Sequence, residues 1–344
     1  MKAVLISDKI LFQDVPTPKL KTNNEVLLKV KAAGLCGSDF YKISDIKQKR
    51  VKKSSILGHE IAGEVVKKGT KITNVSLGDR VVVEPLINCS QCKYCKLGSY
   101  QLCSNLKSLG KELDGGFAEY VVVPAENLFK LGNDVSYKEG VLLDSLAVCL
   151  HASNLAGGYR NKQVAVVGDG TMGVLTAKLA EYQKSKNIVL VGKNIDRLRQ
   201  IISSEVSLCD SENKSLLDKV SEKFDVVIEA VGRKNNKTID QCINLVGPGG
   251  EIIVLGVFPE GYLVKVNARK LFFKEAKIVG CNSYGYFRGS KEIQQAAKLL
   301  NSKKLGLERL ITHFLPLKDF SKGLELFKNK RRSGAIKIVF HPSA

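Results

Sequence analysis

Four cysteines lie within fifteen consecutive positions of the chain, a density that points to metal binding. Four thiolates from one loop suit the closed tetrahedral coordination of structural zinc, which leaves no vacant position for chemistry. A redox-active dithiol is the competing interpretation, and four cysteines at this density favour zinc over it. The spacing C-x2-C-x2-C-x7-C therefore predicts a structural zinc site formed by Cys89, Cys92, Cys95 and Cys103.

Cysteine, histidine and acidic side chains also occur nearer the N-terminus, in Gly34-Leu35-Cys36-Gly37-Ser38-Asp39 and in Gly58-His59-Glu60. These residues are the candidates for a catalytic metal site. Each also has an ordinary structural explanation, Cys36 as a small buried hydrophobe and His59 as a hydrogen-bonded core residue. Spacing alone leaves both interpretations open.

The stretch Gly168-Asp169-Gly170-Thr171-Met172-Gly173 matches G-x-G-x-x-G, follows the predicted strand 163–167 and opens a predicted helix. In this pattern the first glycine makes a tight turn and the second lets the backbone approach a pyrophosphate. The third lets helix and strand pack closely. The helix N-terminus supplies unpaired N–H groups and the positive end of its dipole. This context predicts a dinucleotide site that includes Gly168, Gly170, Thr171, Met172 and Gly173.

The end of the next predicted strand, 187–191, bears on which nicotinamide cofactor fits. An NAD site places Asp or Glu there to bind the ribose 2′-hydroxyl. Here the strand runs into Gly192-Lys193-Asn194, and the first carboxylate is Asp196, expected in the first turn of the next helix. A glycine leaves room for a 2′-phosphate that Lys193 can neutralise, so we predict NADP(H) in preference to NAD(H). The alternative is that Lys193 faces solvent and backbone groups bind the ribose.

Two kinds of domain must position these residues. Up to about residue 131, short β-branched runs are separated by glycine or proline, which predicts a compact, partly barrel-like β domain. From about residue 145, strands alternate with helices, which predicts a parallel sheet with right-handed crossovers and hence an α/β fold class. Further predicted strands are 224–228, 251–255, 310–314 and 335–340, and further helices start near 195 or span 293–300 and 320–327.

Composition limits the classes of protein that fit. With 344 residues, of which 44% are apolar, the chain is ordinary globular sequence long enough for two domains. No apolar run approaches the ~20 residues that a membrane-spanning helix needs, and Asp8 and Lys9 interrupt the N-terminus too early for a secretory signal. We therefore expect a cytoplasmic protein without membrane association, whose nine cysteines point to metal rather than disulfides.

The formal net charge of +20, from 54 Lys plus Arg against 34 Asp plus Glu, raises the question of a polyanionic partner. Only 11 of the basic residues are arginine, the better side chain for bidentate phosphate contacts. They are scattered, the densest stretch is 47–53, and no basic stripe is interleaved with aromatic residues. We interpret the charge as a solvated lysine-rich surface and expect no nucleic-acid partner.

These motifs, in this order, carry a resemblance. From end to end the chain resembles the zinc-dependent medium-chain dehydrogenase/reductase family, and most closely its polyol branch of sorbitol-type and galactitol-phosphate-type dehydrogenases. The matching stretches are 34–39, Gly58-His59-Glu60-x2-Gly63, the four-cysteine lobe, 114–120 and the glycine turn. The resemblance implies a GroES-like catalytic domain from residues 1–150 and 286–344, with a zinc lobe at 88–104, and a Rossmann cofactor domain at 151–285.

The resemblance also implies catalytic zinc ligands at Cys36 and His59, with Glu60 beside them to coordinate or hold the resting ion. Polyol relatives take a further ligand from a Glu-Pro pair before the cofactor domain. Here Asp144 stands at that position without a following proline, and we expect it to be the ligand. We thus expect two zinc ions per chain, one catalytic and one structural. Two rival ligands follow in the sequence, Cys149 and His151.

By the same resemblance, zinc binds the substrate oxygen as a Lewis acid while hydride passes to the nicotinamide. Ser38 is expected to accept the first proton of a relay to solvent. Many relatives have a histidine three residues further on, where this chain has Tyr41, so the relay runs through the cofactor ribose, Tyr41 or water. The segment 280–284 resembles a strand that faces substrate and nicotinamide. Cofactor contacts are expected from Gly192, Lys193, Val231, Leu255, Gly256 and Asn282.

The sequence therefore predicts a reversible oxidoreductase acting on a secondary hydroxyl or ketone of a polyol, cyclitol or sugar-alcohol phosphate. A zinc alcohol or threonine-type amino-alcohol dehydrogenase is the alternative. A catalytically silent binding protein is a distant alternative, which the intact Cys36, His59 and Glu60 oppose. Residues 47–53 or Arg288 offer positive charge for a phosphorylated substrate. By family analogy we expect a homodimer or homotetramer.

Overall fold

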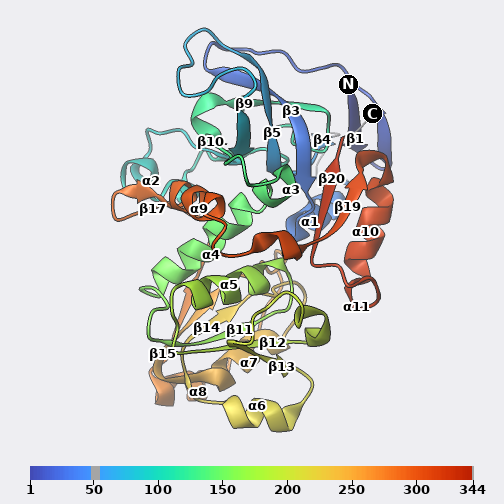
Figure 1. Ribbon diagram of the computed structural model, residues 1–344. Coiled ribbons are helices and arrows are strands. Elements are labelled where there is room, and N and C mark those ends of the chain that lie inside the picture. The colour runs from blue at the N-terminus through green and yellow to red at the C-terminus, as the bar shows by residue number, and fades with distance from the viewer. Residues whose placement is uncertain (48–54, 343–344) are drawn as a thin grey trace. The chain divides into compact units, whose positions relative to one another are not determined.

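The computed structural model describes residues 1–47 and 55–342 (Figure 1). Contacts divide the chain into two compact units, Met1–Asp144 with Arg288–Ala344, and Ser145–Phe287. Apart from the backbone of Lys47, the basic stretch 47–53 lies outside the described residues. Among the helices of the described part, none combines the length and the apolar character needed to cross a bilayer.

The first unit is built around a seven-stranded sheet of order β10-β6-β5-β3-β20-β19, with β9 also paired to β3. Buried and less buried residues alternate along most of β3, as in a strand with one face on a core. This unit confirms the predicted β-rich domain. The strands are β3 (Glu25–Gly34), β5 (Glu60–Lys68), β6 (Arg80–Val83), β9 (Tyr120–Pro124), β10 (Leu128–Lys130), β19 (Ile311–Pro316) and β20 (Lys337–His341).

The register of this sheet brings the candidate metal ligands together. Gly34, the last residue of β3, pairs with Glu60, the first residue of β5, and on its other side with Val339 of β20. Cys36 follows β3 by two residues and His59 directly precedes β5. The pairing of β3 with β5 therefore places residues 36 and 59–60 at one end of the sheet.

The C-terminal segment completes the core of the first unit. Phe320 begins helix α10 (Phe320–Lys328) and Phe340 lies on β20, and both pack against Phe117, with ring centroids 4.8 and 5.7 Å away. All three rings are buried, and such aromatic clusters contribute both area and geometry to a core. Other elements of the unit are β1 (Lys2–Ile6), β2 (Ile10–Asp14), β4 (Ser55–Ile56), β7 (Leu86–Ile87), β8 (Lys107–Ser108), β18 (Ser290–Lys291), α1 (Gly37–Lys47), α2 (Lys93–Lys96), α3 (Tyr137–Gly140), α9 (Glu292–Asn301) and α11 (Lys330–Ser333), and β17 (Tyr286–Phe287) ends the second unit.

The second unit is a six-stranded parallel sheet of order β13-β12-β11-β14-β15-β16. This is the doubly wound order of dinucleotide-binding folds, and it confirms the predicted parallel sheet. Its central strands are almost continuously buried, as expected where both sheet faces are covered. The elements are α4 (Leu143–Leu155, across the boundary), β11 (Gln163–Val167), α5 (Thr171–Tyr182), β12 (Asn187–Gly192), β13 (Val206–Asp210), α6 (Lys214–Val220), β14 (Phe224–Glu229), α7 (Lys237–Leu245), β15 (Val246–Val254), α8 (Ala268–Lys274) and β16 (Lys277–Gly280).

One element differs from its prediction. Instead of a helix from about residue 195, the chain makes a single 3₁₀ turn at Ile195–Leu198 before β13. The following Ile-Ile-Ser-Ser at 201–204 consists of weak helix formers, β-branched residues and serines, which do not favour a longer helix. Asp196 lies in this turn, and its carboxylate is 3.1 Å from Nε of Arg199.

Candidate functional site: two metal clusters and a dinucleotide turn

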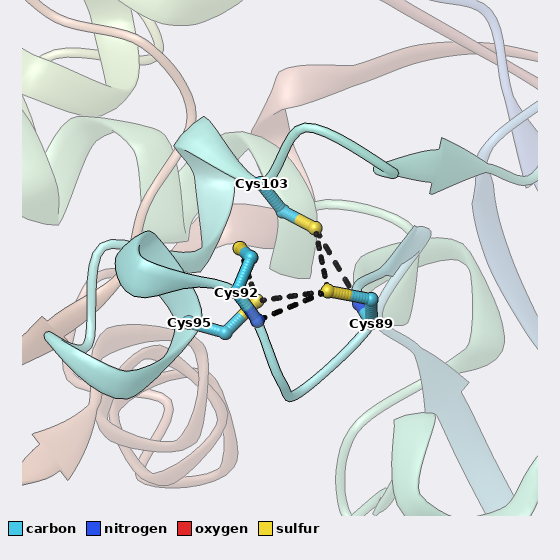
Figure 2. Close-up of side chains that lie close together, drawn as sticks. All are labelled: Cys89, Cys92, Cys95 and Cys103. Atoms are coloured by element: carbon cyan, nitrogen blue, oxygen red, sulfur yellow. Dashed lines mark hydrogen bonds between the residues drawn. The ribbon is translucent and has the colours of Figure 1, made fainter.

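Figure 2 shows four cysteine side chains of the first unit pointing toward one another. The Sγ atoms of Cys92 and Cys95 are 3.5 Å apart, as are those of Cys89 and Cys103, and all four sulfurs lie within 4.8 Å of one another. Zn–S bonds of about 2.3 Å in a tetrahedron require sulfurs about 3.8 Å apart. The predicted structural site therefore has the dimensions of a zinc centre with four cysteine ligands.

Backbone groups of the lobe are directed at these sulfurs. The N–H of Cys92 lies 3.4 Å from Sγ of Cys89, and the N–H of Cys89 lies 3.4 Å from Sγ of Cys103. The backbone N–H of Cys95 lowers the pKa of the Cys92 thiol to about 6, whereas desolvation raises the pKa of Cys95 to about 12. Four adjacent thiolates repel one another, so a bound cation is needed for all four to ionise.

A buried hydrogen-bond network fastens this lobe to the rest of its unit. The Tyr100 hydroxyl, between the third and fourth cysteines, donates to Oε1 of Glu84 at 2.6 Å. Nζ of Lys291 lies 3.4 Å from the other carboxylate oxygen, and Asn127 donates to the Glu84 carbonyl. Burial raises the pKa of Glu84, opposed by Lys291 and Tyr100. Sequence reasoning missed this network because its members are far apart in the chain.

The second cluster consists of Cys36, His59 and Glu60, each with a ligand atom within 4.8 Å of those of the other two. Asp39 supports it from the first turn of α1. One Asp39 oxygen accepts the N–H of Cys36 at 2.9 Å, and the other lies 3.6 Å from Nδ1 of His59. Desolvation opposes charge on His59, yet Cys36 and Asp39 together raise its pKa well above the ordinary value. Cys36 and Asp39 thus favour a positive charge at His59.

Glu60 is held from the C-terminal strand. Nζ of Lys337 on β20 forms an ion pair with Oε2 of Glu60, and both side chains are buried, at 2% and 0% exposure. Gly34 makes room for this pair, because a Cβ at position 34 would collide with the Glu60 carboxylate and lie 2.9 Å from Cε of Lys337. Sequence reasoning included Glu60 but missed Lys337, for which the chain offers no local signal.

The remaining residues predicted for catalysis are not among the three that form this cluster in the described part of the chain. Asp144 lies in the first turn of α4 and near Glu84, whose pKa its charge raises, but it is not part of the three-residue cluster found among the described residues. Ser38 is exposed and Tyr41 half-buried, both on α1. Cys149 and His151 belong to the second unit, where the buried Cys149 thiol accepts from the Thr176 hydroxyl at 3.4 Å.

The glycine turn joins β11 to α5 in the second unit, as predicted. Gly168 has φ of +135°, a left-handed region open to glycine, and a Cβ on Gly173 would collide with the Gly168 carbonyl. Gly170 is the N-cap of α5 and has no side chain with which to cap the helix, as suits a helix N-terminus that faces a phosphate. These features fit a dinucleotide pyrophosphate.

The predicted contacts Val231, Leu255 and Gly256 follow the carboxyl ends of β14 and β15. Glu229 links these two loops, since its side chain accepts the N–H groups of Val231 and Gly232, and its carbonyl accepts those of Leu255 and Gly256 at 2.9 Å. Asn282 follows β16 and is exposed. Glu229 was missed, although an acidic residue ending a buried apolar strand is a detectable signal.

The predicted cofactor contacts Gly192 and Lys193 lie at the end of β12. Lys193 is exposed and paired with Glu212, at 3.3 Å. Gly192 does not leave empty space, because a Cβ there would lie 2.5 Å from Cβ of Asp169, the second residue of the glycine turn. The Asp169 side chain therefore lies against Gly192, and the predicted 2′-phosphate contact there stays a prediction. Asp169 also accepts the N–H of Asn194 at 2.6 Å and contacts Arg197.

Comparison with known proteins identifies both parts of the chain. Residues 22–133 match the alcohol dehydrogenase GroES-like domain and residues 170–302 match the zinc-binding dehydrogenase domain. Galactitol 1-phosphate 5-dehydrogenase of Escherichia coli is 28% identical over 94% of both chains. L-threonine 3-dehydrogenase of Idiomarina loihiensis is 32% identical over 92% of both. A solved zinc-binding dehydrogenase from Sinorhizobium meliloti, bound to NADP, superposes with TM-score 0.87 at 28% identity over 99% of both chains.

Proposed function

Because the chain belongs to the polyol branch of the zinc-dependent medium-chain dehydrogenase/reductase family, we propose that it oxidises a secondary hydroxyl, reversibly, on a polyol, cyclitol or sugar-alcohol phosphate. It is a nicotinamide-dependent alcohol dehydrogenase by family. The observation that carries the proposal is the presence in one chain of the Cys36–His59–Glu60 cluster and of a glycine turn shaped for a pyrophosphate. The similarity to a galactitol-phosphate dehydrogenase supports the substrate class.

The residues around the first cluster have distinct proposed tasks. Zinc bound by Cys36 and His59 supplies Lewis-acid polarisation of the substrate oxygen. Asp39 orients the His59 ring and Lys337 fixes the Glu60 carboxylate. Ser38, exposed at the start of α1, takes up the hydroxyl proton, and Tyr41 lies one helical turn further on. From Ser38 the proton passes to solvent through the cofactor ribose, Tyr41 or water.

We propose two zinc ions per chain, with Asp144 as a further ligand of the catalytic ion. Asp144→Ala is expected to weaken catalytic zinc binding by about 100-fold while the four-cysteine site keeps its ion. Zinc content after dialysis against a mild chelator measures this, with Asp134→Ala, an aspartate on a loop of the same unit, as the control. Unchanged metal content and rate in Asp144→Ala would assign the role to Cys149 or Glu60 instead.

We further propose that NADP(H) is favoured over NAD(H), supported by the lack of an acidic residue at 192–194 and by the NADP-bound relative. Lys193→Ala should then weaken NADP binding about fivefold and NAD binding much less, since an exposed ion contact contributes up to about 1 kcal/mol. The matched variant Glu212→Ala, which releases Lys193, should strengthen NADP binding. Equal effects of Lys193→Ala on both cofactors would contradict a 2′-phosphate contact.

The substrate assignment is tested with a panel of polyols, their phosphates, cyclitols and threonine, each assayed with NAD and with NADP. Preferred turnover of a polyol or its phosphate supports the proposal. Preferred turnover of threonine would favour the amino-alcohol alternative, which the 32% identity to a threonine dehydrogenase supports. One zinc per chain and no turnover of any compound would indicate a silent binding protein. We also propose a cytoplasmic location, with neither a nucleic acid nor a membrane as a partner.

We propose a homodimer or homotetramer, supported by the surface of the second unit. Within the described residues β16 pairs with β15 alone, which leaves one edge of the sheet open. Near it in sequence, Phe272 is 76% and Phe273 64% exposed, and Ile278 on β16 is exposed as well. Open edges with apolar neighbours favour pairing with another copy. Sedimentation of the wild type and of Ile278→Lys, expected to dissociate, tests the assembly.

A further inference from the structure

The carboxyl end of β12 is the place where a doubly wound sheet binds the ribose that carries the cofactor's 2′ group. The residues at this point of the chain, Gly192-Lys193-Asn194, include no carboxylate. The next acidic residue, Asp196, is 87% exposed and forms an ion pair with Arg199. An acidic group is nevertheless present at this end of β12, because it comes from the glycine turn rather than from the strand.

That group is the carboxylate of Asp169. Its Oδ2 accepts the N–H of Asn194 at 2.6 Å, and a Cβ on Gly192 would lie 3.1 Å from the same oxygen. The carboxylate therefore lies directly over the last residue of β12. This is the position that the ribose-binding acid of an NAD site occupies when it belongs to the strand itself.

Arg197 holds Asp169 in this position. One guanidinium nitrogen donates to the Asp169 carbonyl at 2.8 Å and lies 3.4 Å from Oδ1 of its carboxylate. Both side chains are largely buried, at 12% exposure for Arg197 and 19% for Asp169. Lys193, by contrast, is 68% exposed and forms an ion pair with Glu212. Water screens the Lys193 charge far more than it screens the Asp169 carboxylate.

We propose that Asp169 is a specificity-determining residue for the cofactor, whose carboxylate accepts the 2′-hydroxyl of NAD(H) and opposes the 2′-phosphate of NADP(H). This inference rests on the proposed function, since it presumes a dinucleotide at the glycine turn. Asp169 and Lys193 then act in opposite directions at one ribose, so the proposed preference for NADP(H) depends on Lys193, and Asp169 limits its size. Glycine at position 192 makes this arrangement possible, because the Asp169 side chain occupies the space that a Cβ on residue 192 would need.

A purely structural role for Asp169, tying the glycine turn to Asn194, makes a different prediction. Asp169→Asn keeps the size of the side chain and an oxygen that accepts the N–H of Asn194, and removes only the charge. A structural tie would leave the relative binding of the two cofactors unchanged. If the Asp169 carboxylate opposes the 2′-phosphate, removing its charge raises the affinity for NADP(H) relative to the affinity for NAD(H).

The test measures binding of two cofactor fragments, adenosine 2′,5′-bisphosphate and 5′-AMP, to the full chain by isothermal titration calorimetry. Asp169→Asn is expected to raise the affinity ratio of bisphosphate to AMP by about tenfold. Asp169→Ser, also uncharged, should change the ratio in the same direction if Asp169→Asn folds poorly. The matched control is Asp196→Asn, which removes an exposed carboxylate of the same segment and should leave the ratio within about twofold.

A ratio that stays unchanged in both Asp169 variants, while each fragment still binds, overturns the inference and leaves the proposed function intact. Loss of both fragments by an equal factor assigns Asp169 to loop structure and overturns it as well. Failure of the wild type to bind either fragment would remove the dinucleotide site itself, and with it both proposals. Cofactor kinetics of the same variants, compared as kcat/KM with NADP and with NAD, should follow the fragment ratio.

Discussion

His59→Ala is expected to lower kcat/KM by at least about a thousandfold with every substrate that the protein oxidises. A metal acting as Lewis acid stabilises the transition state by several kcal/mol, and each 1.36 kcal/mol is a factor of ten in rate. Two observations support His59 as a ligand. Its ring lies in one cluster with Cys36 and Glu60, and Asp39 contacts Nδ1 of the ring. Steady-state kinetics and zinc analysis on the same sample check it.

The same variant should lose only one metal. Zinc content is expected to fall from about two to about one ion per chain, because the four-cysteine site does not include His59. His313→Ala is the control, since His313 lies in the same unit on β19 and contacts its neighbour Thr312. Wild-type turnover in His59→Ala, or loss of both metals with the fold intact, would exclude His59 as a ligand of a separate catalytic ion.

Lys337→Met is expected to lower the free energy of unfolding by about 3–5 kcal/mol, measured by urea denaturation of zinc-free protein. The substitution keeps most of the apolar volume and leaves the Glu60 carboxylate buried without its cation, which is the costly way to break an ion pair. Bound zinc should reduce this loss, because a cation beside Glu60 replaces part of the missing charge. Unfolding curves with and without zinc therefore differ more in the variant than in the wild type.

Two further variants separate this effect from ordinary loss of a lysine. Lys31→Met removes a partly exposed pair with Glu64, at 3.2 Å, and should cost less than about 1 kcal/mol. Glu60→Gln combined with Lys337→Met should recover part of the stability, since no buried charge remains. If Lys337→Met costs no more than Lys31→Met, the buried pair does not contribute in the way its geometry indicates.

Some features of this protein were readable from the sequence because they are local. The four cysteines lie within one loop, so their spacing alone predicted a cluster with the dimensions of a zinc site. The glycine turn is six residues between a strand and a helix, and its backbone geometry follows from glycine at fixed positions. The alternation of strands and helices likewise predicted the parallel sheet. The hydrophobic periodicity that marks a strand or a helix depends only on residues close together in the sequence.

Other features depended on the tertiary structure, because they join residues that no local pattern connects. Lys337 reaches Glu60, 277 positions away, through the pairing of β20 with β3 and of β3 with β5. Asp169 reaches the end of β12 because two parallel strands end side by side, and a side chain from one turn fills the space over the glycine of the next. The sequence by itself determined the local sites and the order of elements. Strand register decided which distant charges meet, and a charge buried in the fold has to be satisfied by whichever group the register brings to it.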